Sequence, residues 1–357
     1  QSPSFLYVSE RGAPTTLPGR RRLDSFEIAS VLSYTIRGGP PDDALLDAAR
    51  RGALTRGSAR QEQARRLLAQ SSTRHHFRRF VLEWLEVDQL ERTAKVPDVA
   101  THYEDLKPRM LAETSAFVDE VMVNRGASIA SLLDGGFSSV DPKLARFYDF
   151  DAWGPRVDSR RAGRVGLLQQ ASFLAAHAHP DSSSPVKRGD FVLRRLLCIN
   201  LPRPQELDIE VSIPTPDHSL TTRERFSAHQ ANTSCRTCHD SIDALGFTFE
   251  SFDAAGKKRN LENGRAIDTK SHFEFGDLSG DFSDSVELSQ WLAGRSETRD
   301  CFDRHALRYF TAQSDRRVEA SLTRWLGSLP AGKRGDLIET LVAFVGSDWF
   351  VLREEVE

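Results

Sequence analysis

A cysteine pair followed directly by a histidine constrains this 357-residue chain more than any other feature. The segment reads Ser234-Cys235-Arg236-Thr237-Cys238-His239. Two thiols at this spacing can form thioethers to the two vinyl groups of one porphyrin, and the adjacent imidazole can then ligate the iron from the same side. The segment therefore predicts one covalently attached haem c, bound through Cys235 and Cys238, with His239 as the proximal iron ligand.

Two other kinds of site use the same residues and stay open as alternatives, and a structural disulfide between Cys235 and Cys238 is disfavoured because it is sterically poor and uncommon. A structural zinc site needs four ligands, and no second Cys or His pair stands at ligand spacing in the sequence. A redox-active dithiol normally opens a helix that follows a strand, whereas a short helix is expected before Cys235. Both alternatives rank behind haem on these grounds.

Apolar residues recur at spacings of three and four over most of the chain, as on the buried face of a helix. One example is the run Phe77, Phe80, Val81 and Trp84. We therefore predict a mainly α fold, with multi-helix modules around a c-type cytochrome module, irregular loops and one small β-hairpin. Met110 and Met122 lie in such a stripe, so they are poor candidates for iron ligands.

The pattern divides into four segments. We expect an N-terminal helical module at 1–125, an irregular connector at 126–163, the haem module at 164–284 and a C-terminal helical module at 285–357. Local signals within the haem module predict a helix starting at Ser184-Pro185 and ending near Cys198, and a capped helix from Thr221 to His229. A short strand at 209–213 and a hairpin within 259–283 are also expected.

Composition and charge narrow the possible partners. Lys and Arg number 48 against 51 Asp and Glu, giving a formal net charge of −3, which disfavours nucleic acid as a partner. No stretch is long and apolar enough for a membrane span, and no signal peptide is apparent. The first residues resemble the middle of a domain, so we expect this chain to be part of a longer protein. Cys198 and Cys301 form either a disulfide or two buried thiols.

The residues after the cysteine motif carry a family resemblance. This stretch resembles the cytochrome c-type modules described in Planctomycetes and other bacteria, and the helical segments on both sides resemble the modules that flank them. The family's Met and Pro are replaced here by Ile242 and Ala244. The positions that match the family pattern are Asp243, Gly246, Phe247, Glu250, Phe252, Asp253 and Gly256.

The resemblance implies further roles for individual residues. Cys198 and Cys301 match family cysteines, which favours a disulfide, and both this pairing and the haem imply a location outside the cytoplasm. His229 matches a family histidine and is the first candidate for the distal iron ligand, with His177 and His179 behind it. The matching arginines, either partners of the haem propionates or supports of loop backbone, are Arg188, Arg223 and Arg259.

Taken together, these features predict a periplasmic or cell-surface cytochrome that moves single electrons to a redox partner protein or a neighbouring subunit. It would form part of a larger chain or assembly, without an integral membrane segment in this part. Two alternatives remain: a haem peroxidase or oxygenase with an open distal site, and a structural subunit stabilised by haem. No catalytic residue is assigned.

Overall fold

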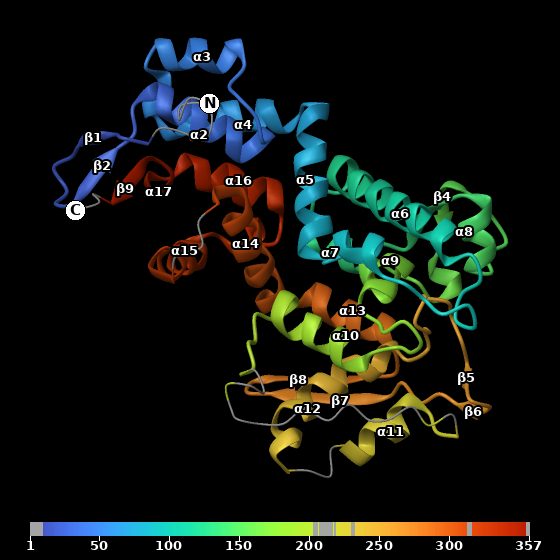
Figure 1. The fold of residues 1–357 in the computed structure, drawn as a ribbon. Coiled ribbons are helices and arrows are strands. Elements are labelled where there is room, and N and C mark those ends of the chain that lie inside the picture. The colour runs from blue at the N-terminus through green and yellow to red at the C-terminus, as the bar shows by residue number, and fades with distance from the viewer. Residues whose placement is uncertain are drawn as a thin grey trace. The chain divides into compact units, whose positions relative to one another are not determined.

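The computed structural model describes residues 10–202, 206, 217, 219–229, 233–312 and 316–354, with the backbone alone at 227–229, 233–235, 237 and 316–320. Helices dominate these residues, and their strands form four small, separate antiparallel sheets (Figure 1). The expected mainly α class is confirmed. The strand expected at 209–213 lies outside the described residues.

The chain forms two compact units. Unit 1 comprises Gln1–Phe80 and Asp303–Glu357, and unit 2 comprises Val81–Phe302. The division falls within helices α5 (Ser71–Trp84) and α14 (Ser296–Thr311). The four segments expected from the sequence rest on residue patterns and not on compactness, so the two units do not test them and they stay a prediction.

Unit 1 combines helices from both parts of the chain with one three-stranded sheet. In that sheet β2 pairs with β1 on one side and with β9 on the other, so Arg20 stands opposite Glu354. The other elements that lie wholly in unit 1 are α2 (Ser25–Arg37), α3 (Asp43–Arg50), α4 (Gly57–Leu68), α15 (Arg316–Ser328), α16 (Leu337–Gly346), α17 (Asp348–Val351), β1 (Ala13–Pro14), β2 (Arg20–Arg22) and β9 (Leu352–Glu354).

A buried arginine joins the two parts of unit 1. Arg60 on α4 is 1% exposed, and its guanidinium donates to main-chain carbonyls in both stretches of sequence that make up the unit. The acceptors are Leu54 (3.0 Å), Thr55 (3.1 Å), Val345 (2.6 Å), Gly346 (3.0 Å) and Ser347 (3.0 Å). Three of these carbonyls, at 345–347, belong to the end of α16 and the residue after it, so the side chain donates to this helix end as a cap would.

Unit 2 holds most of the remaining helices and three two-stranded hairpins among its described residues. Its helices are α6 (Tyr103–Asn124), α7 (Ile129–Asp134), α8 (Pro142–Phe147), α9 (Ala171–Ala176), α10 (Pro185–Phe191), α11 (Thr222–His229), α12 (Thr233–Gly246) and α13 (Ser285–Gly294). Its hairpins are β3 (Phe137–Val140) with β4 (Gly154–Asp158), β5 (Leu261–Glu262) with β6 (Arg265–Ala266), and β7 (Ser271–Phe275) with β8 (Leu278–Phe282).

The segment 126–163 is more regular than expected, since it contains α7, α8 and the β3–β4 hairpin. Buried Glu113 on α6 fixes this region, because its carboxyl accepts hydrogen bonds from Ser138 on β3 and from the Tyr148 hydroxyl (2.5 Å). Tyr148 accepts in turn from the main-chain N–H of Ala171 (2.9 Å). Burial raises the pKa of Glu113 to about 7.

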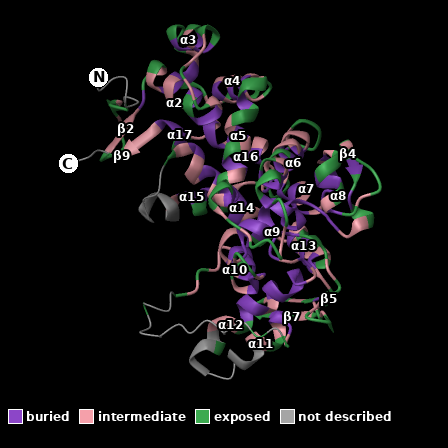
Figure 2. Cartoon of the chain, turned by 45° about the vertical axis from the view of Figure 1, so that its right-hand side comes forward, coloured by how far each residue is buried: buried purple, intermediate pink, exposed green. Residues whose placement is uncertain are grey.

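The centre of unit 2 is a layer of aromatic rings around α9, all six of whose residues are buried (Figure 2). The Phe173 ring lies 4.9 Å from that of Phe191 and 4.6 Å from that of His177, measured between centroids. Trp84 packs edge-on against Phe191 and Phe302. Such pairs combine large apolar burial with favourable ring geometry, which makes this the rigid base on which α10 rests. None of the described helices is both long and apolar enough to cross a lipid bilayer.

Candidate haem site

The cysteine motif lies in the first half of α12. Cys238 and His239 are half-buried there, and Cys238 carries a free thiol. The side chain of Cys235 lies outside the described part of the structure, although its backbone belongs to the same helix. The side chain of His229, the distal candidate, also lies outside it, so that role stays a prediction.

One contact gives the motif histidine a defined orientation. Its Nδ1 lies 3.2 and 3.3 Å from the two carboxylate oxygens of Asp243, one helical turn further on. The Asp243 side chain is 1% exposed, whereas that of His239 is 19% exposed. A carboxylate only accepts hydrogen bonds, so Nδ1 carries the proton and Nε2 is the nitrogen with the lone pair for a metal. The sequence analysis did not assign Asp243 this role, although the spacing of four places both residues on one helix face.

Arg223 on α11 contacts the segment that follows α12. The capping box expected at the start of this helix is present, because Thr221 N–H donates to Glu224 (2.7 Å) and Glu224 N–H donates to Thr221 Oγ1 (3.3 Å). The guanidinium of Arg223 donates to the carbonyls of Asp268 (2.9 Å) and Lys270 (2.7 Å), and its carbon lies 4.4 Å from the centre of the Phe247 ring. These contacts connect α11 to the strands and to the end of α12.

Helix α12 rests directly on α10. Gly189 and Gly246 lie at the crossing, and a methyl group added to either would meet main-chain oxygen: Ile242 O at 1.9 Å and Pro185 O at 2.0 Å, respectively. Only glycine permits such a close approach of two backbones. The expected start of α10 is confirmed, since Ser184 caps it (Lys187 N–H to Oγ, 3.3 Å).

Another buried arginine fixes the loop after α12. Arg188 is fully buried on α10, and its guanidinium donates to four main-chain carbonyls, one in α9 and three in the segment after α12. The acceptors are Leu174 (3.0 Å), Phe249 (3.1 Å), Phe252 (3.1 Å) and Asp253 (2.9 Å). Burial lowers the pKa of Arg188 to about 10, and the charge of Glu250 counteracts this. Arg188 is therefore no partner for a haem propionate, and of its two expected roles the support of loop backbone is correct.

The matching residues Glu250 and Arg259 also serve the loop. Arg259 donates to the Glu250 carbonyl and carboxylate (both 3.2 Å), and Ser183 donates to the same carboxylate (2.7 Å). Burial raises the pKa of Glu250, while the cations of Arg259 and Arg188 lower it. Asp253 Oδ1 accepts hydrogen bonds from the main-chain N–H groups of Ala255 and Lys257, which closes the turn that contains Gly256. These contacts fix the segment 250–257 that follows α12.

The secondary distal candidates have other environments. His177 is buried, and its Nε2 lies 3.0 Å from Leu85 O, to which it donates. Burial lowers the pKa of His177 to about 4, so the ring is neutral and serves the aromatic layer. The role of His177 as a distal ligand stays a prediction. Burial also lowers the pKa of His179, with Lys187 contributing.

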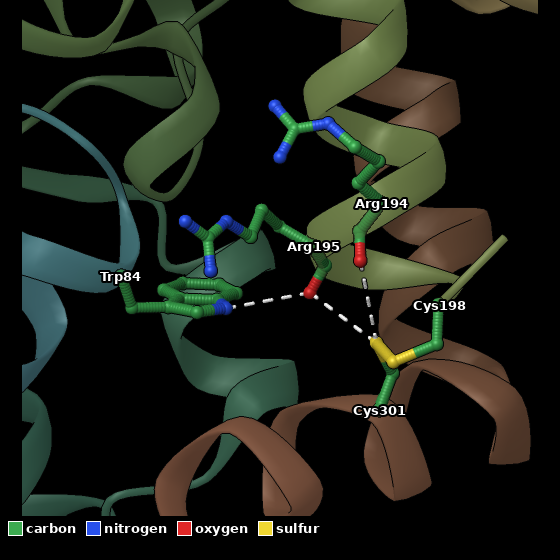
Figure 3. Close-up of a disulfide and its surroundings, with 5 residues drawn as sticks. All are labelled: Trp84, Arg194, Arg195, Cys198 and Cys301. Atoms are coloured by element: carbon green, nitrogen blue, oxygen red, sulfur yellow. Dashed lines mark hydrogen bonds between the residues drawn. A yellow bond between two sulfur atoms is a disulfide. The ribbon is translucent and has the colours of Figure 1, made fainter. Parts of the chain in front are cut away.

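The disulfide between Cys198 and Cys301 is present, with the two Cα atoms 5.5 Å apart. Cys198 follows the π-helical turn Val192–Leu196 that extends α10, and it adopts a left-handed conformation with φ of 54°. Figure 3 shows Cys301 Sγ beside the carbonyls of Arg194 and Arg195, and the second of these also accepts from Trp84 Nε1 (3.3 Å). The disulfide thus joins the end of the extended α10 to α14.

The donor set fits a c-type haem. Two thiol-bearing positions and the histidine share one helix, the two remaining cysteines are engaged with each other, and the imidazole is oriented through Nδ1. The element described before α12 is helix α11 and not a strand, unlike the arrangement typical of a redox dithiol.

Comparison with known proteins gives two matches to family models. Residues 23–150 match PSD4, a protein of unknown function (DUF1592), and residues 164–262 match PSCyt3, a protein of unknown function (DUF1588). No curated protein and no solved structure matches the chain. Both models describe domains without an assigned function, and neither of them covers half of the chain.

Proposed function

We propose that this chain is an extracytoplasmic c-type cytochrome that carries one covalent haem and passes single electrons to a redox partner protein or a neighbouring subunit. The observation that carries the proposal is the Cys235-x-x-Cys238-His239 segment on one helix, with His239 Nδ1 held by buried Asp243. The bound haem would supply a one-electron couple between ferric and ferrous iron.

Each residue of the motif has a defined task in this proposal. Cys235 and Cys238 would hold the haem as thioethers, each made by adding one S–H group across one vinyl double bond without net oxidation. His239 would hold the iron through Nε2, because Asp243 accepts a hydrogen bond from Nδ1–H. Helix α10, the Arg188 contacts and the loop after α12 keep these groups in register.

The disulfide supports the proposed location. Disulfides persist in oxidising compartments and are rare in the bacterial cytoplasm. Haem c is likewise attached outside the cytoplasm in bacteria. Cys198–Cys301 and the haem motif therefore call for the same compartment.

The first test is attachment itself. The full chain is produced in the periplasm of a bacterium that makes c-type cytochromes, and the mass and the pyridine haemochrome spectrum of the purified protein are measured. We expect one haem per chain that resists extraction by acidified acetone. Replacement of Cys235 and Cys238 by Ala should abolish attachment, whereas the same change at Cys198 and Cys301 should leave the haem content per chain unchanged. Protein without haem that contains stoichiometric zinc would contradict the proposal.

The second test separates electron transfer from the alternatives. A sharp low-spin α band in the reduced protein and rapid reoxidation by a one-electron acceptor are expected. A high-spin spectrum that shifts with peroxide, cyanide or carbon monoxide would instead assign the site to peroxidase or oxygenase chemistry. A haem that is neither reduced nor oxidised by external partners would leave only a structural role.

A further inference from the structure

Resting on the haem proposed above, we infer that Asp243 is a positioning residue that makes His239 a strong electron donor and sets the haem to a low reduction potential. The carboxylate acts through the imidazole and does not itself touch the iron. This inference goes beyond haem attachment, because it specifies the energy at which the site exchanges electrons and hence the class of its partner.

The geometry of the contact carries the argument. Both oxygens of Asp243 lie at nearly equal distances from His239 Nδ1, 3.2 and 3.3 Å. Both residues belong to α12, so their relative position is set by a rigid helix and not by a loop. At 1% exposure the carboxylate is shielded from water, which would otherwise compete for the imidazole proton. A charge-assisted hydrogen bond in such surroundings is stronger than one to a neutral acceptor.

The negative charge of Asp243 is balanced inside the fold. Burial lowers the pKa of Arg223, and the charges of Asp268, Glu250 and Asp243 counteract this, so the Arg223 cation interacts with Asp243. The donors of Arg223 are fixed on the carbonyls of Asp268 and Lys270. A buried carboxylate is less costly when a cation lies near enough to interact with its charge, as Arg223 does here.

The hydrogen bond from His239 Nδ1 to Asp243 changes the basicity of the imidazole. As the carboxylate attracts this proton, electron density on the imidazole rises and Nε2 becomes a more basic ligand. A more basic axial ligand stabilises ferric over ferrous iron and lowers the reduction potential. The electron donor to this haem is accordingly a strongly reducing one-electron carrier, and its acceptor lies at higher potential.

The test is a redox titration of the haem-loaded full chain and three variants. Asp243→Asn keeps the shape of the side chain but replaces the charged acceptor. Asp240→Asn is the matched control, because it removes the same charge from the residue next to His239 while its side chain is 57% exposed and paired with Arg236. Asp243→Glu keeps the charge and tests rescue. Haem content is measured first in each protein.

We expect Asp243→Asn to raise the ferrous-to-ferric ratio at fixed potential at least tenfold, a midpoint shift of about 59 mV per tenfold for one electron. Asp240→Asn should change this ratio less than twofold, and Asp243→Glu should restore most of the wild-type value. Equal shifts for Asp243→Asn and Asp240→Asn would overturn the inference, since they would reflect charge alone.

A second measurement needs no variant and so survives a failure of Asp243→Asn to fold. The iron–histidine stretching band of the five-coordinate ferrous protein, generated by photolysis of its carbon monoxide complex, is recorded by resonance Raman spectroscopy. It should lie at higher frequency than in a haem–imidazole complex in water. Equal frequencies would overturn the inference while leaving attachment intact, whereas a wild-type chain without haem would instead refute the proposed function.

Discussion

The crossing of α10 and α12 gives the sharpest structural prediction, because the motif helix has no room to tolerate a single methyl group there. A Cβ at Gly189 would lie 1.9 Å from Ile242 O, and one at Gly246 would lie 2.0 Å from Pro185 O. Real Cβ contacts essentially never fall below 3.0 Å, so the helices must separate by about 1 Å. Main-chain oxygens cannot rotate away as side chains can. Overpacking ordinarily costs about 1–3 kcal/mol, and we expect each Gly→Ala change to reach the upper end of that range.

The assay is native-state hydrogen exchange, read by mass spectrometry for the amides of α10 and α12, because local opening energies stay meaningful in a chain of two units. Gly294→Ala is the control, since Gly294 ends α13 in the same unit and a methyl group there meets nothing within 4 Å. We expect it to be neutral or to stabilise by up to ~1 kcal/mol. The Gly189→Ala/Gly246→Ala double variant should cost less than the sum of the single changes, because the first already opens the crossing. Exchange in Gly189→Ala no faster than in Gly294→Ala would refute the reasoning.

Three further predictions follow from buried groups. Replacing Cys198 and Cys301 by Ala removes a cross-link between positions 103 apart and should cost up to about 4.7 kcal/mol of stability in the chain-entropy model. Because φ at position 198 is 54°, the double variant with Gly at 198 and Ala at 301 should recover roughly 1 kcal/mol. Equal urea midpoints for the two double variants would contradict this second expectation. Burial raises the pKa of Glu113 from 4.5 to about 7, so its protonated form stabilises the folded state fully below pH 4.5, and this stabilisation is lost as the pH rises to about 7. Glu113→Gln should therefore reduce the change in unfolding free energy across this pH window by roughly 3 kcal/mol. An unchanged pH dependence in the variant would count against this prediction. Arg188→Met leaves four main-chain carbonyls without their donor and should cost at least ~3 kcal/mol in denaturant unfolding, whereas a loss below ~1 kcal/mol would show that the carbonyls find other donors.

Local signals predicted much of the framework around the site. Ser184 with Pro185 marked the start of α10, and Thr221 with Glu224 marked the start of α11, because capping depends on neighbouring residues and on little else. The mainly α class followed from the apolar spacing for the same reason. One hairpin was expected within 259–283, and the described residues contain two there.

Features that depend on tertiary structure were not predicted. The strands β3 and β4 lie in a segment that was expected to be irregular. They gave no clear sequence pattern, because each is short and their pairing changes register between Ser138 and Val140. The role of Arg188 depends on carbonyls of α9 and of the segment after α12, which are far apart in sequence, so only the fold distinguishes it from a propionate partner. The contact between His239 and Asp243 was visible as a spacing of four, but the spacing alone does not show that the carboxylate is buried.

The sheet of unit 1 has a consequence for the order in which the protein is made. Because β2 pairs with β9, strand Arg20–Arg22 cannot form this pairing until Leu352–Glu354 has been synthesised and has reached the same compartment. Arg60 likewise waits for the carbonyls at 345–347. All of unit 2, including α12 with its motif, is synthesised in between and is free to fold first. The motif helix is thus expected to be in place before the fold that encloses its sequence is complete.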